Sequence, residues 1–208
     1  MDVITLVGDC GEPYSKMLGI DLEEGDTAWA KWLLASILYA KPIREESATK
    51  TYKAFEAAGL ADARSIVDAG WDRLVEILDK GGYTRYDFST ADRLLEIFGS
   101  LLKNYGGSLR RLYDSSADGR DLERRIVGLG KGIGPVTVSV FLRDMRRVWP
   151  KARPQLTPRI KKSAEALGIR DVTGYADKHG LDVTELETAL HRYSRALSGA
   201  KGPKCLRR

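Results

Sequence analysis

The apolar residues of this chain recur mainly every three or four positions, which is the spacing of an amphipathic helix. Trp29, Trp32, Leu33 and Ile37 follow this spacing in one early segment. Strand-like alternation is nearly absent outside residues 3–7, and no internal repeat or low-complexity tract is present. The sequence therefore predicts an all-α fold of about ten helices and no sheet.

Glycine and proline divide this helical pattern, because glycine commonly ends a helix and proline is tolerated only in its first turn. Gly59, the pair Gly81-Gly82 and the pair Gly106-Gly107 each end a predicted helix. Residues 150–158 contain three prolines and are predicted to form a loop. The predicted helices span residues 28–38, 43–58, 60–69, 71–80, 90–105, 108–114, 120–129, 135–147, 159–167, 172–178 and 184–197. A small-residue, basic tail that we expect to be mobile follows at 198–208.

The most informative string lies between two predicted helices and reads Leu129-Gly130-Lys131-Gly132-Ile133-Gly134-Pro135-Val136-Thr137. Its glycines allow a tight turn around one buried apolar residue and leave peptide N–H groups facing outward. Those donors, with the positive end of the following helix, favour a bound anion such as a phosphate. An ordinary glycine-rich turn between two helices is the alternative.

Composition places the chain among the globular proteins. Its 208 residues are 43% hydrophobic and 30% charged, and no run of about 18 apolar residues occurs, which excludes disordered and membrane-spanning proteins. The net charge is +5, yet residues 143–162 alone hold eight basic residues and one acidic residue. A positive segment directly after the hairpin favours contact with nucleic acid, with a solvated basic face as the alternative.

The cysteines and histidines show no metal-ligand spacing. Cys10 and Cys205 stand near opposite ends of the chain, and neither belongs to a paired motif, so we expect no metal, no iron–sulfur cluster and no other cofactor. Two free thiols are expected in a reducing compartment, and a disulfide between the ends is the alternative. The N-terminus lacks the basic start of a secretory signal, so we expect a cytoplasmic protein that associates with the nucleoid through DNA.

The hairpin string and the short helices around it resemble the helix-hairpin-helix motif of the endonuclease III-like DNA glycosylases. Three further segments resemble parts of the same family: Leu33-Leu34-Ala35-Ser36, Lys103-Asn104-Tyr105-Gly106-Gly107 and His191-Arg192-Tyr193. The resemblance implies two helical domains, residues 29–145 and residues 1–28 with 146–208. It also implies that double-stranded DNA binds across a cleft between them and that a base is flipped out of the duplex into that cleft.

Several positions depart from the family's pattern. Bifunctional members carry a nucleophilic lysine two positions after the last hairpin glycine, where this chain has Val136, so lyase activity is not expected. The family's aspartate, about twenty residues past that glycine, falls in a stretch with Gln155 and Leu156 and no carboxylate. Asp144 is then the candidate catalytic carboxylate, and a surface ion pair with neighbouring arginines is its alternative role.

These observations together predict a monomeric, monofunctional base-excision-repair glycosylase, a hydrolase that removes a damaged or mismatched base from double-stranded DNA. A non-catalytic DNA-binding or lesion-sensing protein on the same fold is the alternative, and a helical protein-interaction scaffold is a third. The predicted base pocket contains Tyr39, Trp149 and Gln155. The predicted DNA contacts are Gly130, Lys131, Gly132, Ile133, Gly134, Thr137, Arg143, Arg147, Lys151 and Arg153.

Overall fold

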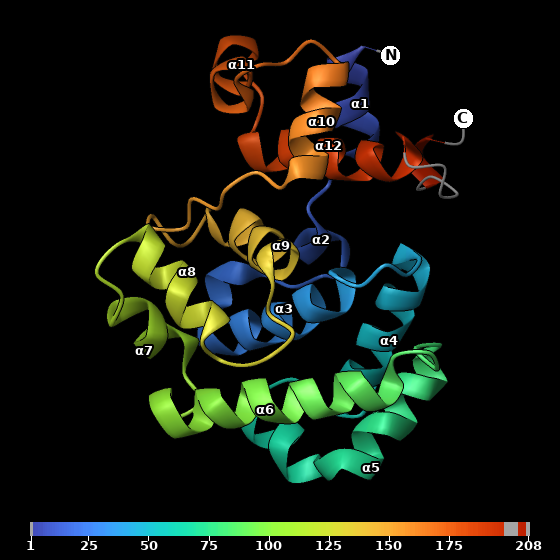
Figure 1. The fold of residues 1–208 in the computed structure, drawn as a ribbon, viewed down its shortest axis with the longest axis vertical. Helices are drawn as coiled ribbons and strands as arrows, with labels where there is room; N and C mark the ends of the chain where they lie inside the picture. The colour runs from blue at the N-terminus through green and yellow to red at the C-terminus, as the bar shows by residue number, and fades with distance from the viewer. Residues whose placement is uncertain (1, 198–203, 207–208) are drawn as a thin grey trace. The chain divides into compact units, whose positions relative to one another are not determined.

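The computed structural model describes residues 2–197 and 204–206, which form helices joined by turns and short loops (Figure 1). No residue within those ranges lies in a strand, so the predicted all-α class is confirmed. Residues 198–203 and 207–208 of the predicted tail lie outside the described residues. The helices are α1 (Val3–Cys10), α2 (Tyr14–Met17), η1 (Leu22–Glu24), α3 (Asp26–Tyr39), α4 (Glu45–Ala57), α5 (Ala63–Gly81), α6 (Asp87–Tyr105), α7 (Leu109–Asp114), α8 (Gly119–Val127), α9 (Pro135–Met145), α10 (Pro158–Ala166), α11 (Val172–His179), α12 (Val183–Leu197) and η2 (Lys204–Leu206).

The chain divides into two compact units. Unit 1 consists of Met1–Gly19 and Gln155–Arg208, and unit 2 consists of Ile20–Pro154. Unit 2 extends beyond the expected domain of residues 29–145 by nine residues at each end, from 20 and to 154. The extensions belong to unit 2 because they pack on α3: the indole Nε1 of Trp29 donates to the carbonyl of Leu22 at 2.8 Å, and the Trp149 ring meets the Trp29 ring edge-on at 5.1 Å.

Helix α3 is the central element of unit 2. Every side chain from Trp32 to Tyr39 is buried, as expected of a helix that is apolar on all sides. It packs against α4, α7, α9 and η1, and the indole of Trp32 donates to the carbonyl of Phe141 on α9 at 3.0 Å. Helices α5 and α6 lie side by side and form the most extensive helix–helix contact of unit 2 (Figure 1). The helices around α3 therefore fix the position of α9, which begins at the hairpin.

Unit 1 has its own core, formed by α1, α10, α11 and α12. Leu6, Ile160, Leu186 and Leu190 are fully buried in it. The buried guanidinium of Arg192 donates to the carbonyls of Cys10 and Glu12, both at 2.7 Å. These two hydrogen bonds attach α12 to the end of α1, so segments far apart in the sequence form one unit.

The expectation of two free thiols was wrong for this structure, because Cys10 and Cys205 form a disulfide bond. Their Cα atoms lie 5.5 Å apart, which is within the usual range for a disulfide. Cys10 is buried in the last turn of α1, and Cys205 packs against the same core. The fold brings the two cysteines together across 195 positions of sequence, a proximity that no local pattern could reveal.

Most predicted helices are present, with boundaries that differ by a few residues. The two helices predicted on either side of residue 70 are merged into α5, in which Gly70 adopts a non-helical conformation and kinks the chain. Apolar and polar residues alternate over residues 3–7 as they would in a strand, but these residues lie in helix α1. The Asp2 side chain caps this helix by accepting a hydrogen bond from the N–H of Thr5. Among the described residues, none of the helices combines the length and the apolar composition that a membrane crossing needs.

Candidate nucleic-acid interface

The glycine-rich string forms a compact turn between α8 and α9. Leu129 and Ile133 are 1% and 4% exposed, so the turn is anchored by apolar side chains near both of its ends. The N–H of Ile133 donates to the carbonyl of Gly130 at 3.4 Å, and Gly132 has a φ of +106°. The region is therefore a helix, a hairpin and a second helix, as the sequence pattern predicts.

The hairpin lies directly against α6, as the loop between α8 and α9 in Figure 1 shows. A Cβ atom placed on Gly130 would lie 3.0 Å from Cγ of Glu96 and 3.0 Å from Cγ1 of Ile97. A Cβ atom placed on Gly132 would lie only 2.6 Å from Cδ of Arg93. Glycine at both positions thus allows the hairpin backbone to approach α6 closely, and at Gly132 it also allows the positive φ.

The N-terminus of α9 is open. Gly134 is the N-cap residue, and no side chain accepts a hydrogen bond from the first turn. Pro135, the first residue of α9, has no N–H, so Val136 and Thr137 carry the first-turn N–H groups that have no acceptor within the helix. A Cβ atom placed on Gly134 would meet nothing within 4 Å. An anion can approach this end without meeting a side chain of Gly134.

Thr137 does not face outward with the hairpin. It is 2% exposed, and its hydroxyl donates to the carbonyl of Gly132 at 3.4 Å. Thr137 was predicted to contact DNA, but its side chain does not do so in this structure, because the buried hydroxyl is hydrogen-bonded to the hairpin backbone. Lys131 is exposed at the tip of the hairpin, where its ammonium can reach a phosphate.

The basic segment after the hairpin is divided between the two units. Arg147 and Arg153 are exposed and belong to unit 2, whereas Arg159, Lys161 and Lys162 belong to unit 1.

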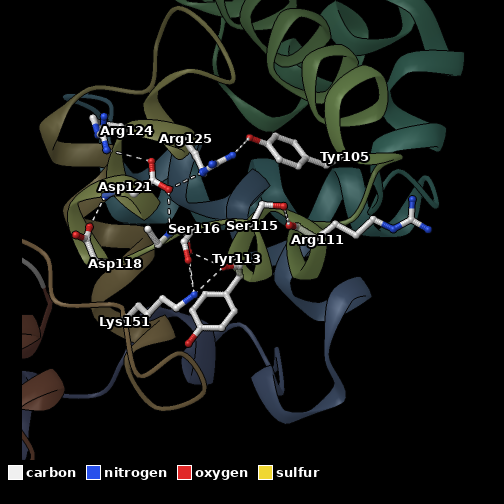
Figure 2. A network of polar contacts seen from close by, with 11 residues as sticks. Tyr105, Arg111, Tyr113, Ser115, Ser116, Asp118, Asp121, Arg124, Arg125 and Lys151 are labelled. Carbon is white, nitrogen blue, oxygen red and sulfur yellow. Dashed lines mark hydrogen bonds and ion pairs between the residues drawn. The ribbon is translucent and has the colours of Figure 1, made fainter.

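Arg143 and Lys151, both predicted as DNA contacts, are used inside unit 2. Arg143 is fully buried, and its Nε donates to Asp144 at 3.3 Å. Lys151 is half-buried, and its ammonium donates to the carbonyls of Tyr113 at 3.2 Å and Ser116 at 2.6 Å (Figure 2). Both predictions were wrong for this structure, because the positive charges are turned toward protein acceptors rather than solvent.

Asp144, the candidate catalytic carboxylate, is 1% exposed. The ion pair expected at the helix surface is instead a buried pair with Arg143. A carboxylate this deeply buried is closed off from the solvent. The acidic group that the fold does place beside the hairpin is Glu96, an exposed residue of α6 that the sequence pattern did not single out.

The predicted base pocket is not assembled from its three residues. Tyr39 is 3% exposed, and its hydroxyl shares a hydrogen bond of 2.5 Å with Thr49. Trp149 is 1% exposed and stacks on Tyr113 with ring centroids 4.9 Å apart. These two rings are core side chains of unit 2 and do not present a free face to a base. Gln155 is exposed and belongs to unit 1.

The sequence pattern did not single out Arg93, a cation beside the hairpin, or Lys41, whose charge interacts with that of Arg93. Arg93 extends from α6 against Gly132, and the half-buried Lys41, just after α3, lies close enough to Arg93 to feel its charge. Burial, and then repulsion from Arg93, lower the pKa of Lys41 below its ordinary value. Neither residue shows a local signal in the sequence, because they are separated from each other and from Gly132 by tens of residues.

A second basic region lies where the C-terminal end of α6 meets α7 and α8. It contains an open cavity of about 860 Å³ lined by Lys103, Asn104, Tyr105, Gly106, Arg111, Asp114, Ser115 and Arg125.

Figure 2 shows that Arg125 is held in this region by Asp121, whose carboxylate accepts from Arg125 Nε at 2.8 Å and from Arg124 at 3.2 Å. The hydrogen bond from Arg125, followed by one from the N–H of Ala117, lowers the pKa of Asp121. Within the described residues, Lys103 and Arg111 carry no ion pair that would neutralise their charge. The cavity is therefore positive and polar.

Comparison of the chain with protein-family models, with curated proteins and with solved structures finds no match in any of the three. Among the described residues, no group of three or more histidine, cysteine, aspartate or glutamate side chains could hold a metal ion.

Proposed function

We propose that this protein binds double-stranded DNA through its sugar–phosphate backbone, with the hairpin of residues 129–134 as the anchor. The observation that carries the proposal is the uncapped N-terminus of α9 at Gly134, presented by a hairpin that α6 holds in place. Peptide donors without an acceptor in the helix and the helix dipole favour an anion at this end. Lys131, beside it, adds a full positive charge.

Contacts of this kind position a protein on DNA without reading its sequence. We therefore expect similar affinity for unrelated duplexes and a steep dependence on salt, because binding releases the cations condensed on the phosphates. Fluorescence anisotropy with two labelled duplexes of unrelated sequence, between about 50 and 200 mM salt, tests both expectations.

Lys131→Ala should weaken binding to both duplexes equally and reduce the salt slope by about one. The matched control is Lys80→Ala, which removes an exposed lysine from the last turn of α5 and should leave the affinity unchanged. Absence of binding to either duplex at the lowest salt concentration would refute the proposal.

Base excision is a second candidate, and Glu96 is the observation that favours it. Its carboxylate is exposed and extends from the part of α6 that contacts the hairpin, and such a group could stabilise the positive charge that develops on a sugar as its base departs. A cationic, alkylated base leaves readily and demands less of the protein than a neutral one.

Glu96→Gln separates the two candidates. If Glu96 only repels the phosphates, the variant binds duplex DNA more tightly, by about threefold, because one nearby negative charge is gone. If Glu96 takes part in base excision, the variant loses base release from a panel of lesion-bearing duplexes, measured as strand breaks after alkali. Absence of base release by the unaltered protein on every lesion leaves non-catalytic DNA binding as the function.

A further inference from the structure

The basic cavity where α6 meets α7 and α8 shares no lining residue with the hairpin. Its volume of about 860 Å³ lies in the range of ligand-binding pockets. Lys103, Arg111 and Arg125 are its cationic lining residues, and Asp114 is its acidic one. Within the described residues, Lys103 and Arg111 form no ion pair. The cavity therefore suits an anionic ligand.

Arg125 is held in a fixed position at this cavity. Its Nε donates to Asp121 at 2.8 Å, and one terminal nitrogen donates to the hydroxyl of Tyr105 at 3.3 Å (Figure 2). Asp121 also accepts from the N–H of Ala117 at 2.9 Å, so the carboxylate that orients the guanidinium is itself fixed. In the described part of the chain, the second terminal nitrogen of Arg125 makes no hydrogen bond, and it is available to a ligand.

Arg111 lies at the other end of Tyr105. A Cβ atom placed on Gly106, the next residue, would lie 2.7 Å from a terminal nitrogen of Arg111, so this guanidinium lies against the backbone at the end of α6. Arg125, in contrast, contacts the Tyr105 hydroxyl. The two guanidinium groups thus stand at opposite ends of one tyrosine rather than around one point (Figure 2). This placement suits two separate anionic groups better than a single one.

Tyr105 supplies an aromatic ring between these two cations. It lines the cavity, and no other aromatic ring among the described residues packs against it. Nucleobases of any sequence stack on such rings, while a positively charged groove follows the phosphates. Each nucleoside within a strand lies between two phosphates, so a cation, a ring and a second cation match the groups of one nucleotide unit in order.

The character of the cavity favours an unpaired strand over two other ligands. The bases of a duplex are stacked on one another, so their faces are closed to a surface side chain. Small-molecule pockets are lined mainly by apolar and aromatic side chains, whereas Tyr105 is the one lining residue here with a large apolar group. A strand with exposed bases and regularly spaced phosphates fits both observations.

We propose that this cavity binds a segment of single-stranded DNA, with one base stacked on Tyr105, one adjoining phosphate at Arg125 and the other at Arg111. Lys103 adds positive charge to the same cavity. The inference rests on the proposed function for the choice of DNA as the ligand. It adds a site for an unpaired strand to the duplex contact at the hairpin.

The first test measures the fluorescence anisotropy of a labelled oligo(dT) of about ten nucleotides, which forms no duplex with itself. Tyr105→Leu should weaken binding by at least about fivefold, because the stacking surface is lost, whereas Tyr105→Phe keeps the ring and should bind within about twofold of the unaltered protein.

Lys103→Met and Arg111→Met remove charge and keep an aliphatic stem. Each should reduce the slope of log affinity against log salt by about 0.7, the value for one phosphate of a single strand. Lys80→Met is the matched control for Lys103→Met, because both lysines lie in the last turn of a long helix of unit 2. Lys80→Met should bind oligo(dT) as the unaltered protein does.

A second measurement locates the stacked base. Oligo(dT) with one iodouracil in place of thymine, irradiated while bound, should crosslink to Tyr105, and mass spectrometry identifies the modified residue. Lys80→Met should crosslink at the same residue. Unchanged melting temperatures of the variants show that they are folded.

The outcomes separate the inference from the proposed function. No binding of oligo(dT) at about 50 mM salt, or binding that neither Tyr105→Leu nor Lys103→Met weakens, would overturn the inference and leave duplex binding by the hairpin intact. Binding of oligo(dT) through Tyr105 without any binding of duplex DNA would support the inference and refute the proposed function. A dinucleotide with one phosphate that binds as tightly as oligo(dT) would indicate a small-ligand pocket and overturn the inference.

Discussion

Substitutions at two of the hairpin glycines, Gly132 and Gly134, should affect protein stability and DNA affinity differently. Gly132→Ala forces alanine into a φ of +106°, and the added methyl group would lie 2.6 Å from Cδ of Arg93. The backbone strain alone costs about 1–3 kcal/mol. Arg93 can move its flexible side chain aside, and doing so removes it from the hairpin.

Gly134→Ala is the contrasting change. Its φ is −103°, which alanine adopts freely, and a Cβ atom there meets nothing within 4 Å. We therefore expect its free energy of unfolding to stay within about 1 kcal/mol of the unaltered value. DNA affinity should still fall, by about five- to tenfold or roughly 1 kcal/mol, because the methyl group stands where a phosphate approaches the first turn of α9.

The assay combines thermal unfolding with duplex binding by anisotropy. Gly132→Ala should lower the melting temperature by roughly 3–8 °C and weaken binding, whereas Gly134→Ala should weaken binding alone. Gly99→Ala, within α6 and also facing open space, should be at least as stable as the unaltered protein and bind DNA equally well. Equal DNA affinity of Gly134→Ala and the unaltered protein would show that no phosphate reaches the end of α9.

Three further substitutions or treatments test other parts of the structure. Asp144→Ala removes the carboxylate beside the buried Arg143 and should lower the free energy of unfolding by about 3–5 kcal/mol in urea; a variant as stable as the unaltered protein would contradict a structural role. Lys151→Met removes the donor to two carbonyls and should cost about 1–3 kcal/mol by the same measurement, with DNA affinity per folded molecule unchanged if the side chain serves only the fold. Reduction of the Cys10–Cys205 disulfide should destabilise unit 1 by about 2–4 kcal/mol and leave the unfolding of unit 2 unchanged. A melting curve that is the same with and without reductant would argue against the disulfide bond.

The sequence predicts what depends on neighbouring residues. The hairpin, the helices on each side of it and the all-α class follow from glycine, proline and apolar spacing within short windows. Even the kink at Gly70 is indicated by the break between two predicted helices, although the structure joins them into α5.

Features that depend on distant contacts could not be predicted in this way. Trp149 looks like a surface residue beside a proline in a charged stretch, yet it is buried because its ring packs on Trp29 of α3 and Tyr113 of α7. Arg143 looks like a surface cation, yet it is fully buried. Arg93 shows no local signal because it meets Gly132 only through the fold. Periodicity shows which face of a helix is apolar, but it does not show which partner that face meets.

Unit 1 is built from two segments that are separated in the sequence by the whole of unit 2, and this affects the order in which the two units can fold. Val3 and Leu6 share a core with Leu186 and Leu190, and all of unit 2 lies between these segments in the sequence. During synthesis from the N-terminus, unit 2 is complete in sequence and can fold while α1 still lacks its partners. Until α12 has been synthesised, the apolar face of α1 lacks the helix that covers it in the folded unit.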